Sequence, residues 1–209
     1  MLIPFDVLLV FVTASAALAL APGPDNIFVL TQSAVHGRFA GVIVTLGLQT
    51  GVIVHSILVA IGVAAIFQTS ETAFTALKLA GAAYLIFLAW KVFRAGAADL
   101  VTEDTPARSL KKLYATGVIM NITNPKVAIF FLAFLPQFAD PDRGSVTAQV
   151  FLFGGVFAAT GLVLFGAVAW GAGFLGEWLS RSPRAQSVLN RVAGVVFLGL
   201  AARLLMTER

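Results

Sequence analysis

The residues best suited to chemistry are Pro125 and Lys126, inside an apolar run that extends from about Leu113 to Phe138. A proline in a helix interior removes one backbone hydrogen bond and clashes with the preceding turn. A lysine at bilayer depth costs about 2.5 to 3.5 kcal/mol. Irregular backbone at that depth is tolerated where it is buried in protein or lines a watery cavity, so a binding site is predicted here. The alternative is a plain proline kink beside a lysine that reaches towards the surface.

A second break, at Ala21–Asn26, carries an acid that could balance this lysine. Asp25 would lie in the first turn of a half-helix, where the helix dipole favours a carboxylate. Asn124 and Pro125 suit the cap and first residue of another half-helix, whose dipole disfavours Lys126. We therefore expect Asp25 and Lys126 to neutralise each other. Either a substrate carboxylate competes for the lysine, or the two form a purely structural ion pair.

The two breaks and the polar residues near them define the predicted site. Gln49 is included because a deep amide has four hydrogen-bonding positions to satisfy. Asp25 is the predicted proton-coupling residue, and His55, whose side chain titrates near neutral pH, is the second candidate, although a lone histidine more often bonds a neighbouring helix. No catalytic set or metal-ligand cluster is recognisable, so no enzyme activity, metal or cofactor is expected. The predicted substrate-binding residues are Asn124, Pro125, Lys126, Asn121, Gln49, Pro22, Gly23 and Pro24.

Composition places the chain in a membrane. Its 209 residues are 59% hydrophobic and 11% charged, which leaves too little polar surface for an ordinary soluble domain. The net charge of +4 comes from basic residues spread over connections, so nucleic acid is not an expected partner. Cysteine is absent, which excludes thiol chemistry. Ala19–Ala21 could imitate a signal-peptide cleavage site, but no Lys or Arg precedes Arg38, so this run is predicted to be a membrane helix.

Six apolar segments predict an all-α integral membrane protein with six transmembrane helices in one domain, residues 1–209. Each segment is long enough for a hydrocarbon core of about 30 Å at about 1.5 Å per residue. The first and fourth should be broken at their prolines. The segments run from about Leu2 to Ala21 with a continuation to Val35, then Phe39 to Phe67, Ala73 to Phe93, Leu113 to Phe138, Ala148 to Phe174 and Leu189 to Met206.

Small residues indicate where these helices pack closely. Gly47 and Gly51 lie four residues apart on the second segment, and Gly155, Ala159 and Gly166 form a stripe on the fifth. We expect close helix contacts at both places and no chemistry.

The two halves of the sequence repeat each other. Residues 78–85 (KLAGAAYL) match residues 191–198 (RVAGVVFL), and each half opens with a broken segment. A unit of three membrane helices ends on the opposite side of the membrane from where it starts. Two successive three-helix units therefore have opposite orientations. We predict inverted repeats, about 1–95 and 110–209, joined by a polar loop at 94–112; such repeats with matching broken helices are typical of secondary transporters. Ala-Gly pairs, common in membrane helices, are the alternative reason for the match.

Lys and Arg residues predict the orientation, since basic residues favour the cytoplasmic side. Nine flank the first, third and fifth connections, and four flank the opposite side. Both termini are therefore predicted to lie outside, in an inner membrane, with the 94–112 loop in the cytoplasm. The nine are Arg38, Lys91, Arg94, Arg108, Lys111, Lys112, Arg181, Arg184 and Arg191; the four are Lys78, Arg143, Arg203 and Arg209.

Five motifs together resemble the lysine exporter and homoserine/threonine resistance (LysE/RhtB) family. They are Ala21–Asp25, Gly47–Gly51, Gly81–Leu85, Asn121–Lys126 and Phe134–Phe138, in order over nearly the whole chain. The resemblance implies an inner-membrane amino-acid exporter of six helices, driven by the proton gradient, with its two proline motifs at Pro22–Pro24 and Asn124–Lys126. It does not give the substrate, since members differ among basic, small hydroxylated, and branched or sulfur-containing amino acids.

We predict a secondary transporter that exports small neutral amino acids such as threonine or homoserine, by proton antiport with alternating access. One acid, one base and helix amides suit a zwitterion, and Phe28 and Val29 beside Asp25 leave no second carboxylate for a dibasic side chain. An exporter of basic or branched amino acids, and a membrane channel or scaffold without coupled transport, are the alternatives. The expected partners are the amino-acid substrate, protons and the lipid bilayer; a homo-oligomer is left open.

Overall fold

The computed structural model describes residues 2–21, 23–69, 71–95 and 109–206, and within these residues every regular element is helical. The bounds follow the predicted segments closely. The α-helices are α1 (Phe5–Leu20), α2 (Pro24–His36), α3 (Arg38–Thr69), α4 (Glu71–Arg94), α5 (Leu110–Thr123), α6 (Pro125–Ile129), α7 (Val146–Arg181) and α8 (Pro183–Met206). A π-helix η1 (Phe130–Phe134) and two 3-10 helices, η2 (Leu135–Phe138) and η3 (Pro141–Arg143), lie between α6 and α7.

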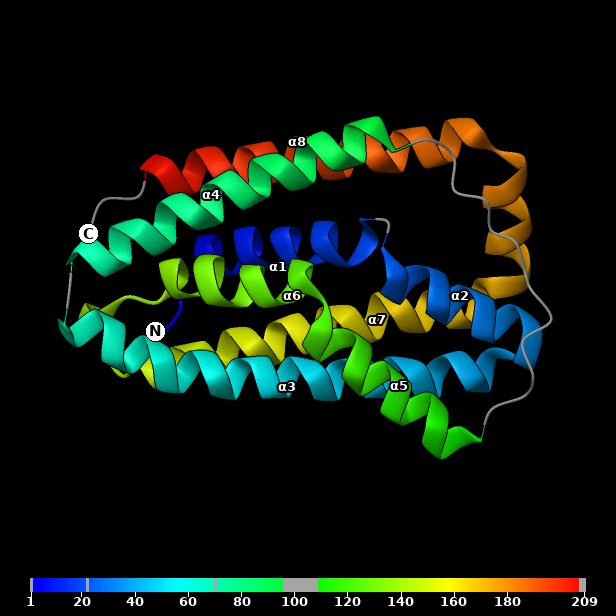
Figure 1. The fold of residues 1–209 in the computed structure, drawn as a ribbon, viewed down its shortest axis with the longest axis horizontal. Helices are drawn as coiled ribbons and strands as arrows, with labels where there is room; N and C mark the ends of the chain where they lie inside the picture. The colour runs from blue at the N-terminus through cyan, green and yellow to red at the C-terminus, as the bar shows by residue number, and fades with distance from the viewer. Residues whose placement is uncertain (1, 22, 70, 96–108, 207–209) are drawn as a thin grey trace.

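The helices run back and forth along the long axis of the molecule (Figure 1). The pair α1 and α2 crosses in one direction, α3 returns, and α4 crosses again; α5 with α6, α7 and α8 then repeat the traverse with the opposite sense. Both ends of the chain therefore lie at the same end of the bundle. α4 packs along α8, and α3 packs along α5 and α7.

Both predicted breaks are present. α1 and α2 meet at 63°, and the segment from Leu110 to Thr123 meets the segment from Pro125 to Phe138 at 51°. In each case a proline is the first residue of the second half-helix, Pro24 in α2 and Pro125 in α6. Proline suits this position because its missing N–H would be unpaired there anyway.

Three helices are each long and apolar enough to cross a membrane alone, and the two bent pairs raise the number to five. The three stretches are Arg38–Gly62, Val146–Ala172 and Arg184–Met206. Within the described residues α4 is not among them; it is 24 residues long and contains two lysines, an arginine and a glutamate. The all-α membrane fold is thus confirmed, while the sixth span and the inverted repeat stay predictions.

The helix after the second break changes its winding at Phe130. α6 widens into the π-helix η1, in which the N–H of Leu135 donates to the carbonyl of Phe130, and then tightens into η2 around Pro136. In an α-helix the ring of Pro136 would clash with the carbonyl four residues earlier. A wider turn ahead of the proline avoids that clash and keeps the backbone paired. The sequence analysis predicted the break at Asn124 but not this second irregularity.

Phenylalanine rings fill the core on the side of the breaks nearer to the two termini. The centroids of the Phe11 and Phe153 rings lie 4.7 Å apart, and those of Phe134 and Phe138 lie 4.8 Å apart. All members are buried, so this part of the bundle excludes water. We call this cluster the aromatic layer; its members are Phe11, Phe130, Phe131, Phe134, Phe138, Phe153 and Phe157.

Glycines allow the close helix contacts, though not all of those predicted. A Cβ added to Gly51 would lie 2.6 Å from the Cβ of Asn121 on α5, as expected for a packing position. On α7 the prediction was wrong by one residue, because Gly155 and Gly166 meet nothing within 4 Å whereas Gly154 packs against Ser56 on α3. One residue is 100° of helix rotation, enough to turn a stripe away from its neighbour.

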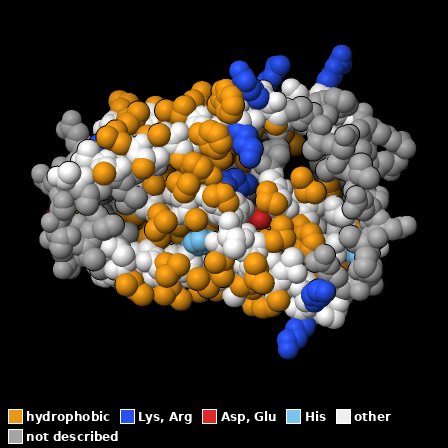
Figure 2. Space-filling view, viewed as in Figure 1, with side chains coloured by type: hydrophobic (Ala, Val, Ile, Leu, Met, Phe, Trp, Pro, Cys, Tyr) orange, Lys and Arg blue, Asp and Glu red, His pale blue; other side chains and the backbone are white. Residues whose placement is uncertain are grey.

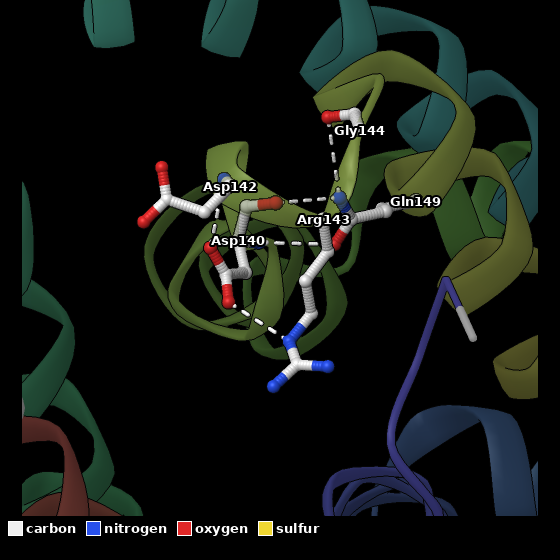
Figure 3. Close-up of polar contacts among 5 residues, drawn as sticks. All are labelled: Asp140, Asp142, Arg143, Gly144 and Gln149. Atoms are coloured by element: carbon white, nitrogen blue, oxygen red, sulfur yellow. Dashed lines mark hydrogen bonds and ion pairs between the residues drawn. The ribbon is translucent and has the colours of Figure 1, made fainter.

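The connection from η2 to α7 is closed by polar contacts at the end of the bundle that holds the termini (Figure 3). The buried Gln149 side chain accepts from the Asp140 N–H at 2.9 Å and donates to the Asp140 carbonyl at 2.8 Å. The Asp140 carboxylate accepts from the Arg143 side chain at 3.0 Å and from the Asp142 N–H at 2.9 Å. These bonds fix the turn that starts α7.

The surface is apolar over most of the face drawn in Figure 2, with Lys and Arg side chains mainly at its upper and lower margins. Large exposed apolar residues include Val163 (70%) and Trp170 (66%). Such a surface suits contact with lipid. Most of the 94–112 loop, residues 96–108, lies outside the described residues.

Candidate functional site

Asn124 links the two breaks through its side chain. Its Oδ1 accepts from the Lys126 N–H at 3.0 Å, which caps α6 as the sequence predicted. Its Nδ2 donates to Oδ2 of Asp25 at 2.8 Å, across 99 residues of chain. Asn124 is itself buried. One amide therefore starts one half-helix and holds the acid of the other.

Lys126 binds the end of α1 rather than the carboxylate of Asp25. Its Nζ donates to the carbonyls of Leu18 at 2.9 Å and Ala21 at 3.0 Å. These carbonyls have no partner within the helix, and the negative end of the α1 dipole favours a cation there. No direct ion pair joins Asp25 and Lys126 within the described residues, although the two charges still attract each other, as the expected neutralisation requires. The C-terminal carbonyls of α1 supply the partial negative charge that the lysine needs.

Asp25 retains an unused acceptor in the protein interior. The side chain is 3% exposed, and its Oδ1 has no hydrogen-bond partner. The position at the start of α2 is the predicted one, and the helix dipole stabilises the carboxylate there. A buried oxygen without a partner is costly unless a ligand or proton uses it.

Gly23 allows the lysine to come close to the first break. A Cβ at Gly23 would lie 3.3 Å from Lys126 Nζ, closer than ordinary van der Waals contact. Pro22 lies outside the described residues, so its predicted role stays a prediction.

A cavity of about 350 Å³ opens where the two breaks face α4. The breaks contribute Ala21, Gly23, Pro24, Asn124, Pro125 and Lys126, and α8 contributes Phe197. The rest of the lining comes from α4 and extends to Ala95, just after the last residue of that helix. The cavity therefore lies on the side of the breaks away from the aromatic layer. Its volume falls in the range of small-molecule sites, about 300 to 1,000 Å³.

Three predicted site residues lie apart from this cavity. Gln49 packs against α7, where a Cβ on Gly161 would come within 2.7 Å of its amide nitrogen. The His55 ring nitrogen lies 3.2 Å from the Asn121 carbonyl, so helix-to-helix bonding accounts for it. Gln49 and Asn121 each keep a buried side-chain oxygen without a partner. Their predicted roles, and the relay role of His55, stay predictions.

The contribution of α4 to the lining was not predicted from the sequence. Lys91 entered only the count of basic residues for orientation, and Tyr84 only the internal repeat and a family motif. Tyr84 and Phe197 occupy the matching aromatic position of the two repeated octapeptides, and both line the cavity. That correspondence could have indicated them.

The chain is similar to known proteins over most of its length. A family model described as LysE type translocator matches residues 16–208. The chain is 35% identical over 196 residues to a homoserine/homoserine lactone efflux protein of Salmonella typhimurium, with 93% of each chain covered. It is 33% identical over 193 residues to a membrane protein of Vibrio cholerae (91% and 92% covered), and 26% identical over 199 residues to a leucine efflux protein of Enterobacter (93% and 92%). No solved structure matches.

Proposed function

Because this chain belongs to the LysE type translocator family, we propose that it exports small neutral amino acids such as threonine and homoserine, by proton antiport with alternating access. One relative is named for the efflux of homoserine and homoserine lactone, and another for the efflux of leucine; homoserine and leucine are neutral amino acids. The same proposal places the chain in an inner membrane with both termini outside.

The observation that carries the proposal is the cavity at the two breaks, with Lys126 in its wall. An ammonium group has three N–H donors. Two of them are held by the Leu18 and Ala21 carbonyls. The third is left for the α-carboxylate of a substrate, in a position fixed by the other two.

Asp25 supplies the second half of a site for a zwitterion. Its unpartnered Oδ1 is buried behind Asn124 and Pro24, which line the cavity. A shift of the Asn124 amide, which bonds the other oxygen at 2.8 Å, would open Asp25 to a substrate ammonium or to a proton. Substrate and proton would then use one carboxylate in turn, which is the requirement for exchange. Opposite motion of the two broken halves would expose that carboxylate to each side alternately.

A branched apolar amino acid is the second candidate, favoured by one observation. Beside Tyr84 and Lys91, the lining from α4 and α8 is apolar: Phe87, Leu88, Val92 and Phe197. A leucine-like side chain would bury its methyl groups there, at about 0.8 kcal/mol per CH₂.

Counterflow in proteoliposomes tests the substrate class. Vesicles containing the purified full-length protein are loaded with one unlabelled amino acid, and uptake of the same labelled amino acid is followed. We expect a transient overshoot for homoserine and threonine and little signal for lysine. An overshoot with leucine would support the second candidate. Lys126→Met should lose the overshoot, whereas Lys112→Met, a change of an exposed lysine at the start of α5, should keep it.

Two results would contradict the proposal. A stronger overshoot with lysine than with homoserine or threonine would assign the protein to the basic amino acids. Equilibration of label without any overshoot would indicate a pore.

A further inference from the structure

α4 presents one face to the cavity, and that face contains a single charged residue. Its lining residues are spaced at three or four positions along the helix, as one face of an α-helix requires. Lys91 lies in the last turn, where the helix dipole favours a cation. The lining residues from α4 are Tyr84, Phe87, Leu88, Lys91 and Val92, followed by Ala95 just after the helix.

The lining as a whole carries two cations and no carboxylate. Lys126 comes from the second break and Lys91 from α4, while Asp25 is not part of the lining. Lys91 is exposed, and no ion pair is recorded for it within the part of the chain that the structure describes. The Asn190 side chain donates to the Ala95 carbonyl at 3.3 Å and so ties the end of this wall to α8.

The two lysines have different tasks. Lys126 is held by two backbone carbonyls, which fix it as a binding group. Lys91 is not held in this way, so its effect on a ligand is mainly its charge. A positive charge in a narrow cavity attracts a carboxylate and repels a second ammonium. Specificity commonly depends on such a repulsive element as well as on attractive contacts.

We propose that Lys91 is the specificity-determining residue that excludes dibasic amino acids, whose side chain would bring a second ammonium into the cavity. The inference rests on the proposed export of neutral amino acids and names the residue that sets its limit. It assigns Lys91 a role in selection, separate from the binding of the α-carboxylate by Lys126.

Charge reversal tests the proposal directly. In the counterflow assay, Lys91→Glu should lower the ratio of homoserine to lysine transport by about tenfold, the order expected for a reversed unit charge at a few ångströms in a watery site. Lys91→Gln should give an intermediate ratio, and Lys91→Arg should keep the original one.

The matched control is Arg94→Glu. Arg94 lies three residues further along α4, stacks on the Trp90 ring at 4.7 Å and is not in the lining. Because the natural chain has no cysteine, Lys91→Cys also allows the charge to be set after folding. After modification with a thiol reagent that carries a negative sulfonate, Lys91→Cys should transport lysine. After modification with a reagent that carries a positive trimethylammonium group, it should not.

Three outcomes would overturn the inference. An unchanged ratio in an active Lys91→Glu protein would show that its charge does not select. An equal shift with Arg94→Glu would assign the effect to general surface potential. Absence of counterflow for every amino acid in the unmodified protein would overturn the proposed function itself, and this inference with it.

Discussion

At the residue scale, the site depends on which groups satisfy Asp25 and Lys126. The cap at Asn124 and Pro125 is a local feature, so the sequence predicted it correctly. The partners of Lys126 could not be predicted, because the Leu18 and Ala21 carbonyls lie more than 100 residues away in the chain. An interior lysine indicates that a negative partner exists, but that partner can be the C-terminal end of a helix instead of a carboxylate.

Asp25→Asn tests coupling at the same scale. The amide keeps the shape of the protonated acid but cannot release a proton, so proton-driven accumulation should be abolished. Some substrate exchange should remain, weakened because the amide lacks the charge that attracts the substrate ammonium. Accumulation against a gradient under an imposed pH difference, measured beside counterflow at equal pH, separates the two activities. Concentrative transport with an unchanged pH profile would exclude Asp25 as the coupling residue and make His55 the next to test.

At the element scale, the broken helices were predictable and their mutual contacts were only partly so. Proline positions determine both breaks. The π-helix η1 (Phe130–Phe134) is one of several ways in which the backbone can avoid a clash with the ring of Pro136, so it could not be predicted from the sequence. The role of α4 as a cavity wall depends on which of its faces is turned inward. Because a membrane helix is hydrophobic on all sides, its sequence does not show which face that is.

The contact between α3 and α5 gives a prediction of this kind. A Cβ on Gly117 would lie 2.5 Å from the Val44 carbonyl, so Gly117→Ala must push the two helices apart. We expect a loss of about 1 to 3 kcal/mol in stability, as for other overpacked positions. Thermal unfolding in detergent measures it. Gly155→Ala, which meets nothing within 4 Å, is the control, and equal melting temperatures for the two variants would contradict the packing argument.

At the scale of the whole molecule, basic residues distinguish the two ends of the bundle. Within the described residues most of them lie near the end that carries the α2–α3 and α4–α5 connections, opposite the termini (Figure 1). Composition was sufficient to predict the membrane class, and charge counting predicts an orientation, because both are sums over many residues. The cavity, in contrast, arises where four separate segments meet, the two breaks, α4 and α8, and only the two breaks were predicted from the sequence as parts of a site.

Cysteine labelling tests the orientation in a chain that has no natural cysteine. Asp99→Cys, in the part of the polar loop outside the described residues, should resist an impermeant maleimide in whole cells and react after lysis. Asp142→Cys, exposed in η3 at the opposite end, should react in whole cells. The reverse pattern would place the termini inside.

In the proposed inner-membrane placement, the aromatic layer would also decide where the membrane voltage acts. Solution in the cavity would carry the potential of one side up to the two breaks, so most of the voltage would fall across the packed rings rather than across the bilayer core of about 30 Å. Moving one elementary charge through that drop is worth about 2.3 kcal/mol per 100 mV. Lys126, the second residue of α6, belongs to the segment that leads into the layer at Phe130. A rearrangement of a few side chains there would perform the electrical work of a full crossing.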